Sequence, residues 1–582
     1  MGETVFAAGE AAVSREASRS RRRVAIAALI LVCAVALFDH LGAPALFEPD
    51  EGRNAEKARE ILLLHDWVTP HENFLVVLDK PIPYYWLVAA SYRIFGVSEW
   101  SARFPSAAAA AGCLVLVFLF ARRQFGFWPG LWAALVLMTS LEFFLLSRVV
   151  IFDMALTFFT TLALWCFFAA LGEPARGRRR MSLLFMYSAM AAATLIKGPI
   201  GVVLPGMVIA LYLIFSRRLS ALRDLDLPLG IALFILIVAP WHYLVEARNP
   251  GYLRYFFWQE NIERYLTPHF NRRGAWYYFL IVAAVGFFPW TLNILAVFKQ
   301  AWQRRHDNAV LFVSLWALLP LIFFSFSSAK LPHYILPIFP PLAVLTGLAI
   351  ERAIAAQEPG SRRLLALSSL VLCLIMIGFT FALGSWRWLP LAARIAMAKL
   401  PGSLTLWSGA ASLIFGGLAF STWTGRWRSQ KWLFLGFALG FILYINVVIE
   451  LLADISTKRS SRDLAQQVSA VIDPSIQLAI YDTSFESLPF YLKTARPIWI
   501  VWSGAKKSVM GSFYLAEEGA APAPGYSRSL LTFEEFDKAW GDYPKGRLAV
   551  FLKKKNLPRF EEKLPRAAKI LLEYDDLVVV TN

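Results

Sequence analysis

The chain is organised as a long series of apolar segments separated by short polar loops. Many of these segments exceed the roughly 18 residues that a helix needs to cross a lipid bilayer. We therefore predict a polytopic α-helical membrane protein with about thirteen transmembrane helices. The predicted spans cover residues 24–41, 104–121, 128–147, 154–172, 182–196, 199–216, 227–246, 276–298, 308–326, 334–351, 364–385, 403–421 and 433–452.

One apolar segment does not fit this series. Pro81–Gly96 is short and contains Arg93, and counting it as a span would place the basic pair Arg122–Arg123 outside. The segment is rich in Tyr and Trp, which favour the membrane–water interface. We predict an interfacial helix on the external face, and a short tilted span is the alternative.

Basic clusters orient the chain, because short basic loops remain on the cytoplasmic side of a membrane. One cluster alone is consistent with an ordinary solvated loop, but seven that fit one alternating pattern favour a common side. The prediction is a basic cytoplasmic tail over residues 1–23, a transmembrane domain over 24–452 and an external carboxyl terminus. The clusters are Arg19 with Arg21–Arg23, Arg122–Arg123, Arg176 with Arg178–Arg180, Arg217–Arg218, Arg304–Arg305, Arg362–Arg363, and Arg426 with Arg428 and Lys431.

Composition supports a membrane protein and argues against a nucleic-acid partner. Of the 582 residues, 58% are hydrophobic and 17% are charged. Soluble domains are typically about 45–50% apolar and about 25% charged. The net charge of +17 is explained by the cytoplasmic loops. The four cysteines lie inside apolar segments, which gives no indication of disulfides or of a cysteine metal site.

The last part of the chain, residues 453–582, changes character. Strand-like stretches at 476–482, 497–503, 547–552 and 577–581 follow a helix-like stretch at Ser461–Ile472. This pattern predicts a small external α/β domain. Neither a GxxxxGK[S/T] loop nor a GxGxxG motif is present in the sequence, so nothing points to nucleotide binding.

Acidic residues gather at the external ends of the predicted spans. Asp50 and Glu51 lie in the first external loop, residues 42–103, and Asp153 follows the third span. Carboxylates at a membrane boundary are candidates for function. Asp50 is also a candidate cap for a helix over Glu51–Leu64, and Asp153 for the fourth span. Their shared face favours a catalytic site over two separate caps.

Cations lie on the same predicted face, at Lys80, Arg264 and Lys330. Such a group suits a phosphate-bearing lipid. Cations can stabilise a departing phosphate while a carboxylate takes a proton from an attacking hydroxyl. Salt bridges between loops and binding of lipid headgroups are the alternatives.

Several motifs in a fixed order carry a resemblance to a known family. PDEGRNAEKAREI, LDKPIPYYWL, ARFPSA, SRVVIFDMAL and SSAKLPHYILPIFPPLA fall in turn over about residues 45–350. Together they resemble the protein-mannosyltransferase-like family of bacterial membrane glycosyltransferases, and most of all the branch that transfers aminoarabinose to lipid A.

The resemblance implies a C-type glycosyltransferase fold in the bacterial inner membrane, with an active site that faces the periplasm. It implies transfer of a sugar, 4-amino-4-deoxy-L-arabinose, from undecaprenyl phosphate to a lipid or glycan acceptor, here lipid A phosphate. It also implies roles for residues. Asp50 is the expected catalytic carboxylate, and Asp153 is the second acidic position. Lys80 faces the donor phosphate, and Arg264 and Tyr334 belong to the same pocket.

The sequence departs from the family pattern around this lysine. The KPP motif reads Lys80-Pro81-Ile82, the preceding residue is Asp79 rather than Glu, and a metal-binding histidine is replaced within Gln259-Glu260-Asn261. We therefore expect no required cofactor, with Asp79 and Glu260 as candidate ligands for a structural divalent ion.

Two other functions remain open at this stage. A transporter or flippase for a lipid-linked substrate would use similar charges, although no inverted repeat is evident. A transferase of the same family that modifies protein hydroxyls or a surface polysaccharide is the second alternative.

Overall fold

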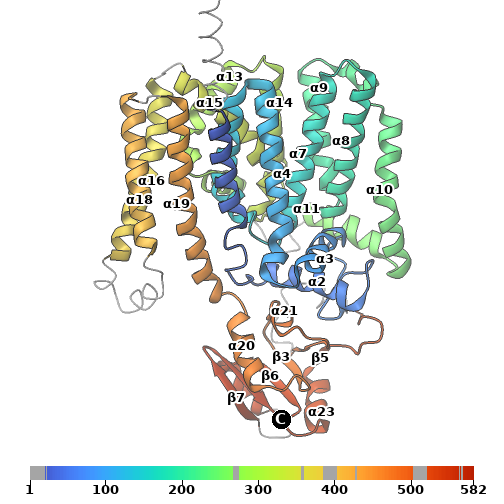
Figure 1. Ribbon diagram of the computed structural model, residues 1–582. Helices are drawn as coiled ribbons and strands as arrows, with labels where there is room; N and C mark the ends of the chain where they lie inside the picture. The colour runs from blue at the N-terminus through green and yellow to red at the C-terminus, as the bar shows by residue number, and fades with distance from the viewer. Residues whose placement is uncertain are drawn as a thin grey trace, which may run out of the picture.

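The computed structural model describes residues 20–582 except 21, 267–273, 356–358, 385–402, 427–428, 503–520, 563 and 565–567. It forms a bundle of roughly parallel helices with a small α/β domain beyond one end (Figure 1). Most of the expected tail over residues 1–23 lies outside the described residues.

Every predicted span coincides with helical structure. A helix over 22–38 matches the first span. The others match α4 (Glu99–Phe125), α5 (Phe127–Thr139) with α6 (Leu141–Leu146), α7 (Phe152–Leu171), α8 (Arg176–Lys197), α9 (Ile200–Phe215), α10 (Leu227–Arg248), α12 (Tyr278–Gly286) with α13 (Ile294–Gln303), α14 (Asn308–Ser325), α15 (Phe339–Ala355), α16 (Pro359–Gly384), α18 (Ser403–Thr424) and α19 (Gln430–Thr457).

When helices are judged by length and apolar composition alone, fewer than thirteen of those described qualify as membrane spans. Within the described ranges, eight helices are long and apolar enough to cross a membrane, or nine if the bent α12–α13 pair counts as one span. The apolar helices α5 and α9 are shorter than a bilayer requires, and α8 begins with the basic stretch RGRRR. The fold is a polytopic membrane bundle, and the count of thirteen stays a prediction.

Two expected spans are broken rather than continuous. The span at 128–147 is interrupted at Ser140, between α5 and α6. The span at 276–298 bends by 107° at the break between Gly286 and η3 (Trp290–Asn293). Pro289 lacks a backbone N–H and cannot continue a helical hydrogen-bond ladder. The backbone N–H of Leu141 donates to the carbonyl of Phe288 at 3.1 Å, so the two breaks lie against each other.

The first external loop contains α2 (Asp50–Leu64), the two short strands β1 (His71–Glu72) and β2 (Leu75–Val76), and α3 (Pro83–Phe95). Both helices lie between the bundle and the α/β domain (Figure 1), and α3 is not among the candidate spans. The predicted capping roles are wrong. Pro49 precedes α2 and Ile151 precedes α7, and neither Asp50 nor Asp153 caps its helix.

The second external loop, expected over about 247–275, contains helical structure that the sequence did not predict. Arg254–Glu263 forms a π-helix, and α11 (Arg264–Leu266) continues it. Gly198, with φ of +85°, lies against this π-helix. A Cβ atom there would approach the ring of Phe256 to 2.8 Å. Glycine is therefore required for the α8–α9 junction to pack this closely.

The carboxyl-terminal domain is built on a six-stranded sheet in the order β5-β4-β3-β6-β8-β7. Strands β3 to β6 pair in parallel, and β8 pairs antiparallel with β6 and β7. The predicted strands correspond to β3 (Gln477–Tyr481), β4 (Trp499–Trp502), β6 (Leu548–Lys553) and β8 (Leu577–Thr581), and the predicted helix to α20 (Arg462–Val471).

Two edge strands of this sheet were missed, β5 (Leu530–Thr532) and β7 (Lys569–Tyr574), and so were the helices α21 (Leu488–Leu492), α23 (Phe533–Asp542) and α24 (Leu557–Glu561). Edge strands carry weaker sequence signals, since one side is unpaired and charged residues are tolerated there. Helix α19 extends to Thr457, past the expected domain boundary at 452.

Candidate active site

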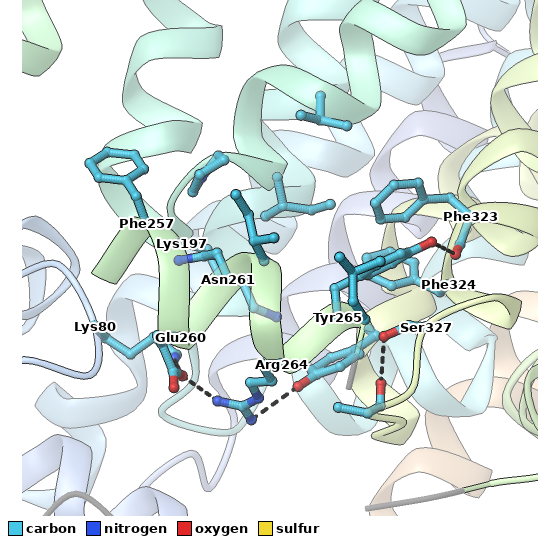
Figure 2. Close-up of a pocket in the computed structure, with 17 residues that line it drawn as sticks. Lys80, Lys197, Phe257, Glu260, Asn261, Arg264, Tyr265, Phe323, Phe324 and Ser327 are labelled. Carbon is cyan, nitrogen blue, oxygen red and sulfur yellow. Dashed lines mark hydrogen bonds and ion pairs between the residues drawn. The ribbon is translucent and has the colours of Figure 1, made fainter. Parts of the chain in front are cut away.

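A cavity of about 440 Å³ lies where the α8–α9 junction, the π-helix and the end of α14 meet. Lys80, in the segment between β2 and α3, reaches it from the first external loop. One wall is apolar, and the opposite side carries charge (Figure 2). The apolar wall includes Ile200, Val203, Phe257 and Phe323. The cavity therefore suits a ligand with a charged head and a hydrocarbon tail.

Glu260 stands between two cations at this cavity. Lys80 Nζ lies 2.5 Å from Glu260 Oε1, and the guanidinium of Arg264 contacts the same oxygen. Figure 2 shows the two cations approaching the carboxylate from opposite sides. Arg264 also donates to the hydroxyl of Tyr334 at 3.3 Å. The three charges leave an excess of one positive charge, which favours a monoanionic ligand.

Lys197 is a site residue that sequence reasoning missed. Its ammonium group lines the cavity, contacts the carboxylate of Asp153, and lies 4.7 Å from the centre of the Tyr334 ring. His333 Nε2 lies 3.8 Å from the other oxygen of Asp153. The available signal was a lysine at the end of the mostly apolar second part of α8, since intramembrane charges are functional candidates.

Asp50 lies apart from the residues that line the cavity. Its carboxylate is exposed and pairs with Arg53 one turn along α2. Burial opposes the charged form of Arg53, but the carboxylates of Glu72, Asp50 and Asp79 more than compensate and raise its pKa. Asp79 adjoins Lys80, which donates to the Asp79 carbonyl at 2.8 Å. A charged network thus runs from Asp50 to the edge of the cavity.

Glu51, a candidate catalytic carboxylate in the sequence, is buried in a salt bridge with Arg103. Its side chain is 1% exposed and accepts hydrogen bonds from Arg103 at 2.8 and 2.9 Å. The backbone N–H groups of Phe47 and Val150 also donate to it, at 3.0 and 2.9 Å. With both oxygens occupied, Glu51 joins the first external loop to the segment before α7 and presents no free carboxylate to a substrate.

Lys330 is likewise not brought into the cavity lining. Its ammonium donates to the carbonyl of Ser325 at 2.6 Å and lies over the ring of Phe279. Burial lowers the pKa of Lys330. The neighbouring Ser327 and Ala329 line the cavity instead.

The residues at the candidate metal site fit a cation-paired network better than a divalent ion. Lys57 Nζ lies 3.1 Å from Asp79, and although burial disfavours the charged form, Lys57 and Lys80 lower the pKa of Asp79. Glu260 is held by its own two cations. Across the described residues, no group of three or more His, Cys, Asp or Glu side chains has a metal-binding arrangement.

A bundle of membrane helices with this charged cavity, and an α/β domain beyond the first loop, defines a polytopic membrane protein of C-type glycosyltransferase fold. ArnT from Cupriavidus metallidurans bound to undecaprenyl phosphate has the same fold, with a TM-score of 0.79 at 25% identity. That likeness covers 96% of this chain and 97% of the other. Its apo state matches equally well.

The amino-acid sequence is similar to a family model and to curated relatives. Residues 79–244 match the family model described as dolichyl-phosphate-mannose-protein mannosyltransferase. The chain is 32% identical, over 62% of its length, to undecaprenyl phosphate-alpha-4-amino-4-deoxy-L-arabinose arabinosyl transferase 2 of Pseudomonas fluorescens, and 34% identical, over 52%, to the transferase of that name from Aeromonas hydrophila. The matches span 66% and 55% of these relatives. The chain belongs to the protein-mannosyltransferase-like family of bacterial membrane glycosyltransferases.

Proposed function

We propose that this protein transfers a sugar from undecaprenyl phosphate to an acceptor at the periplasmic face of the inner membrane. The proposed sugar is 4-amino-4-deoxy-L-arabinose, and the proposed acceptor is a phosphate of lipid A. The observation that carries the proposal is the cavity with one excess positive charge beside an apolar wall. The names of the relatives and the undecaprenyl phosphate bound to the similar structure support the choice of donor.

The donor would place its phosphate among Lys80, Arg264 and Tyr334, and its prenyl chain along the apolar wall. The acceptor oxygen attacks the anomeric carbon as the bond from that carbon to the phosphate oxygen breaks. Undecaprenyl phosphate leaves with the bonding electrons, and the cations stabilise its developing charge. Lys197 would add a third cation, with its position fixed by Asp153.

Asp50 is the proposed catalytic carboxylate. It is exposed at the start of α2, on the loop that also supplies Lys80. It can accept the remaining proton of the acceptor phosphate, or the proton of an acceptor hydroxyl, and it can orient the attacking oxygen. Asp153, paired with Lys197 and near His333, would hold the cation that faces the donor.

Asp50→Asn tests this proposal. The substitution keeps the size of the side chain and removes the proton acceptor, and the exposed site predicts unchanged folding. Transfer to purified lipid A should fall by about two orders of magnitude or more. Asp39→Asn, another exposed acidic residue at the end of the first span, serves as the matched control and should keep full activity. Wild-type transfer by Asp50→Asn would refute the assigned mechanism.

A further inference from the structure

The segment around Asp50 is held by the carboxyl-terminal domain. Glu48 Oε1 accepts hydrogen bonds from the Ser487 hydroxyl at 2.6 Å, from the Ser487 backbone N–H at 3.2 Å, and from the hydroxyl of Ser461. The backbone N–H of Glu48 donates to the carbonyl of Arg459 at 2.9 Å. One side chain, two residues before Asp50, thus binds two separate segments of the other domain.

Neighbouring residues add to this attachment. The backbone N–H of Leu46 donates to the Tyr491 hydroxyl, and that of Ala45 donates to the hydroxyl of Ser456 in the last turn of α19, each at 2.8 Å. Gly52 packs directly on Ser487, and a Cβ atom there would lie 2.6 Å from the Ser487 nitrogen. Contacts to the carboxyl-terminal domain therefore flank Asp50 on both sides.

A second attachment lies farther along the first loop. The Asn73 side chain accepts from the backbone N–H of Ile498 at 2.9 Å and donates to its carbonyl at 2.6 Å. Arg59 donates to the carbonyl of Thr494 at 2.7 Å. This attachment joins the same two parts of the chain, but it is removed from the start of α2.

Asp50 itself makes no contact of this kind in the described structure, and its carboxylate is exposed and paired only with Arg53. The backbone around it is fixed, and the side chain is left accessible. Such an arrangement suits a reactive group, because small errors in the position of a catalytic group can cost about 100-fold in rate.

We propose that the carboxyl-terminal domain positions Asp50 for the transfer reaction and that Glu48 is the positioning residue. The domain is then a working part of the active site rather than an appendage. This inference rests on the proposed function, in which Asp50 is the catalytic carboxylate.

Glu48→Ala, Glu48→Gln and Asn73→Ala in the full-length protein test the proposal. Glu48→Ala should lower kcat by about 10- to 100-fold and leave KM for the donor and binding of undecaprenyl phosphate unchanged, since Lys80 and the cavity are untouched. Glu48→Gln keeps the accepting oxygen and should restore most of the activity. Asn73→Ala removes the two hydrogen bonds to Ile498 in the distant attachment and should keep kcat near that of the wild type.

Hydrogen exchange of the backbone amides at the start of α2 gives a second readout. Exchange there should rise in Glu48→Ala and stay low in Asn73→Ala. A wild-type kcat for Glu48→Ala would overturn the inference, and so would an equal loss of kcat in both Ala variants or a parallel loss of lipid binding. Failure of the proposed function is separable, because it is signalled by full activity of Asp50→Asn.

Discussion

The charge balance around Glu260 predicts that removal of a cation and removal of the carboxylate change the affinity for undecaprenyl phosphate in opposite directions. Lys80 and Arg264 share one carboxylate, and Lys197 is neutralised by Asp153, so the cavity holds one net positive charge. A sugar–phosphate–prenyl donor is a phosphodiester with one negative charge. The prenyl phosphate product is a monoester, and it carries close to two at pH 7.

Lys80→Ala removes a partly buried cation, whose side chain is 18% exposed. Loss of a charge-assisted hydrogen bond costs about 1.5–3 kcal/mol, which corresponds to a roughly 10- to 150-fold weaker affinity for undecaprenyl phosphate. Glu260→Gln removes a carboxylate that lines the cavity proposed for the phosphate. For two like charges separated by about 6 Å, the lost repulsion is of order 2–3 kcal/mol at an effective dielectric of about 20. Affinity for undecaprenyl phosphate should then rise roughly 30- to 150-fold.

The assay is equilibrium binding of undecaprenyl phosphate to the purified protein in lipid nanodiscs, at two salt concentrations. Multiple-turnover kinetics should show a second consequence, because tighter product binding by Glu260→Gln slows release and lowers kcat, whereas single-turnover transfer should be maintained. Lys80→Ala should weaken both binding and donor use. If the two variants change affinity in the same direction, the phosphate does not bind between these side chains.

The remaining predictions concern topology and pH. A cysteine replacing Arg426 should resist labelling from outside intact cells, whereas one replacing the exposed Lys493 of the carboxyl-terminal domain should be labelled; labelling of the first would refute the assigned orientation. Burial, with Glu48 and Glu72 nearby and only partly offset by Arg53, raises the pKa of Glu486 from 4.5 to about 7. The folded protein therefore keeps this proton longer than the unfolded chain, and stability should fall as pH rises from about 4.5 to 7. Glu486→Gln should flatten that decline in melting temperature, and an unchanged profile would show that Glu486 does not titrate there.

The sequence by itself determined the bundle, because the length of an apolar segment and the charge of the loops beside it are local properties. It placed the strands β3, β4, β6 and β8 as well, since buried strands are short runs of apolar residues. It also identified Lys80 and Arg264 as members of one cationic group. Helix α3 was separable from the predicted spans by its length and its arginine.

The sequence did not predict which charges neutralise each other. In the sequence Glu51 is equivalent to Asp50. In the structure Glu51 is buried in a salt bridge with Arg103, which lies 52 residues later in the chain. Lys330 looked equivalent to Lys80, but its ammonium binds a backbone carbonyl outside the cavity lining. Lys197 lines the cavity and is paired with Asp153, a contact that the sequence did not predict.

The tertiary structure also decided where helices break and which domain holds the first loop. The hydrogen bond from Leu141 to Phe288 joins the break between α12 and α13 to the break before α6, two sites far apart in the sequence. The bonds from Glu48 to Ser461 and Ser487 join residues more than 400 positions apart. Ion pairs and hydrogen bonds form between groups that folding brings within a few ångströms of each other. Local patterns of polarity therefore specify the elements and the candidate groups, whereas the partner of each group is set only when the chain has closed around it.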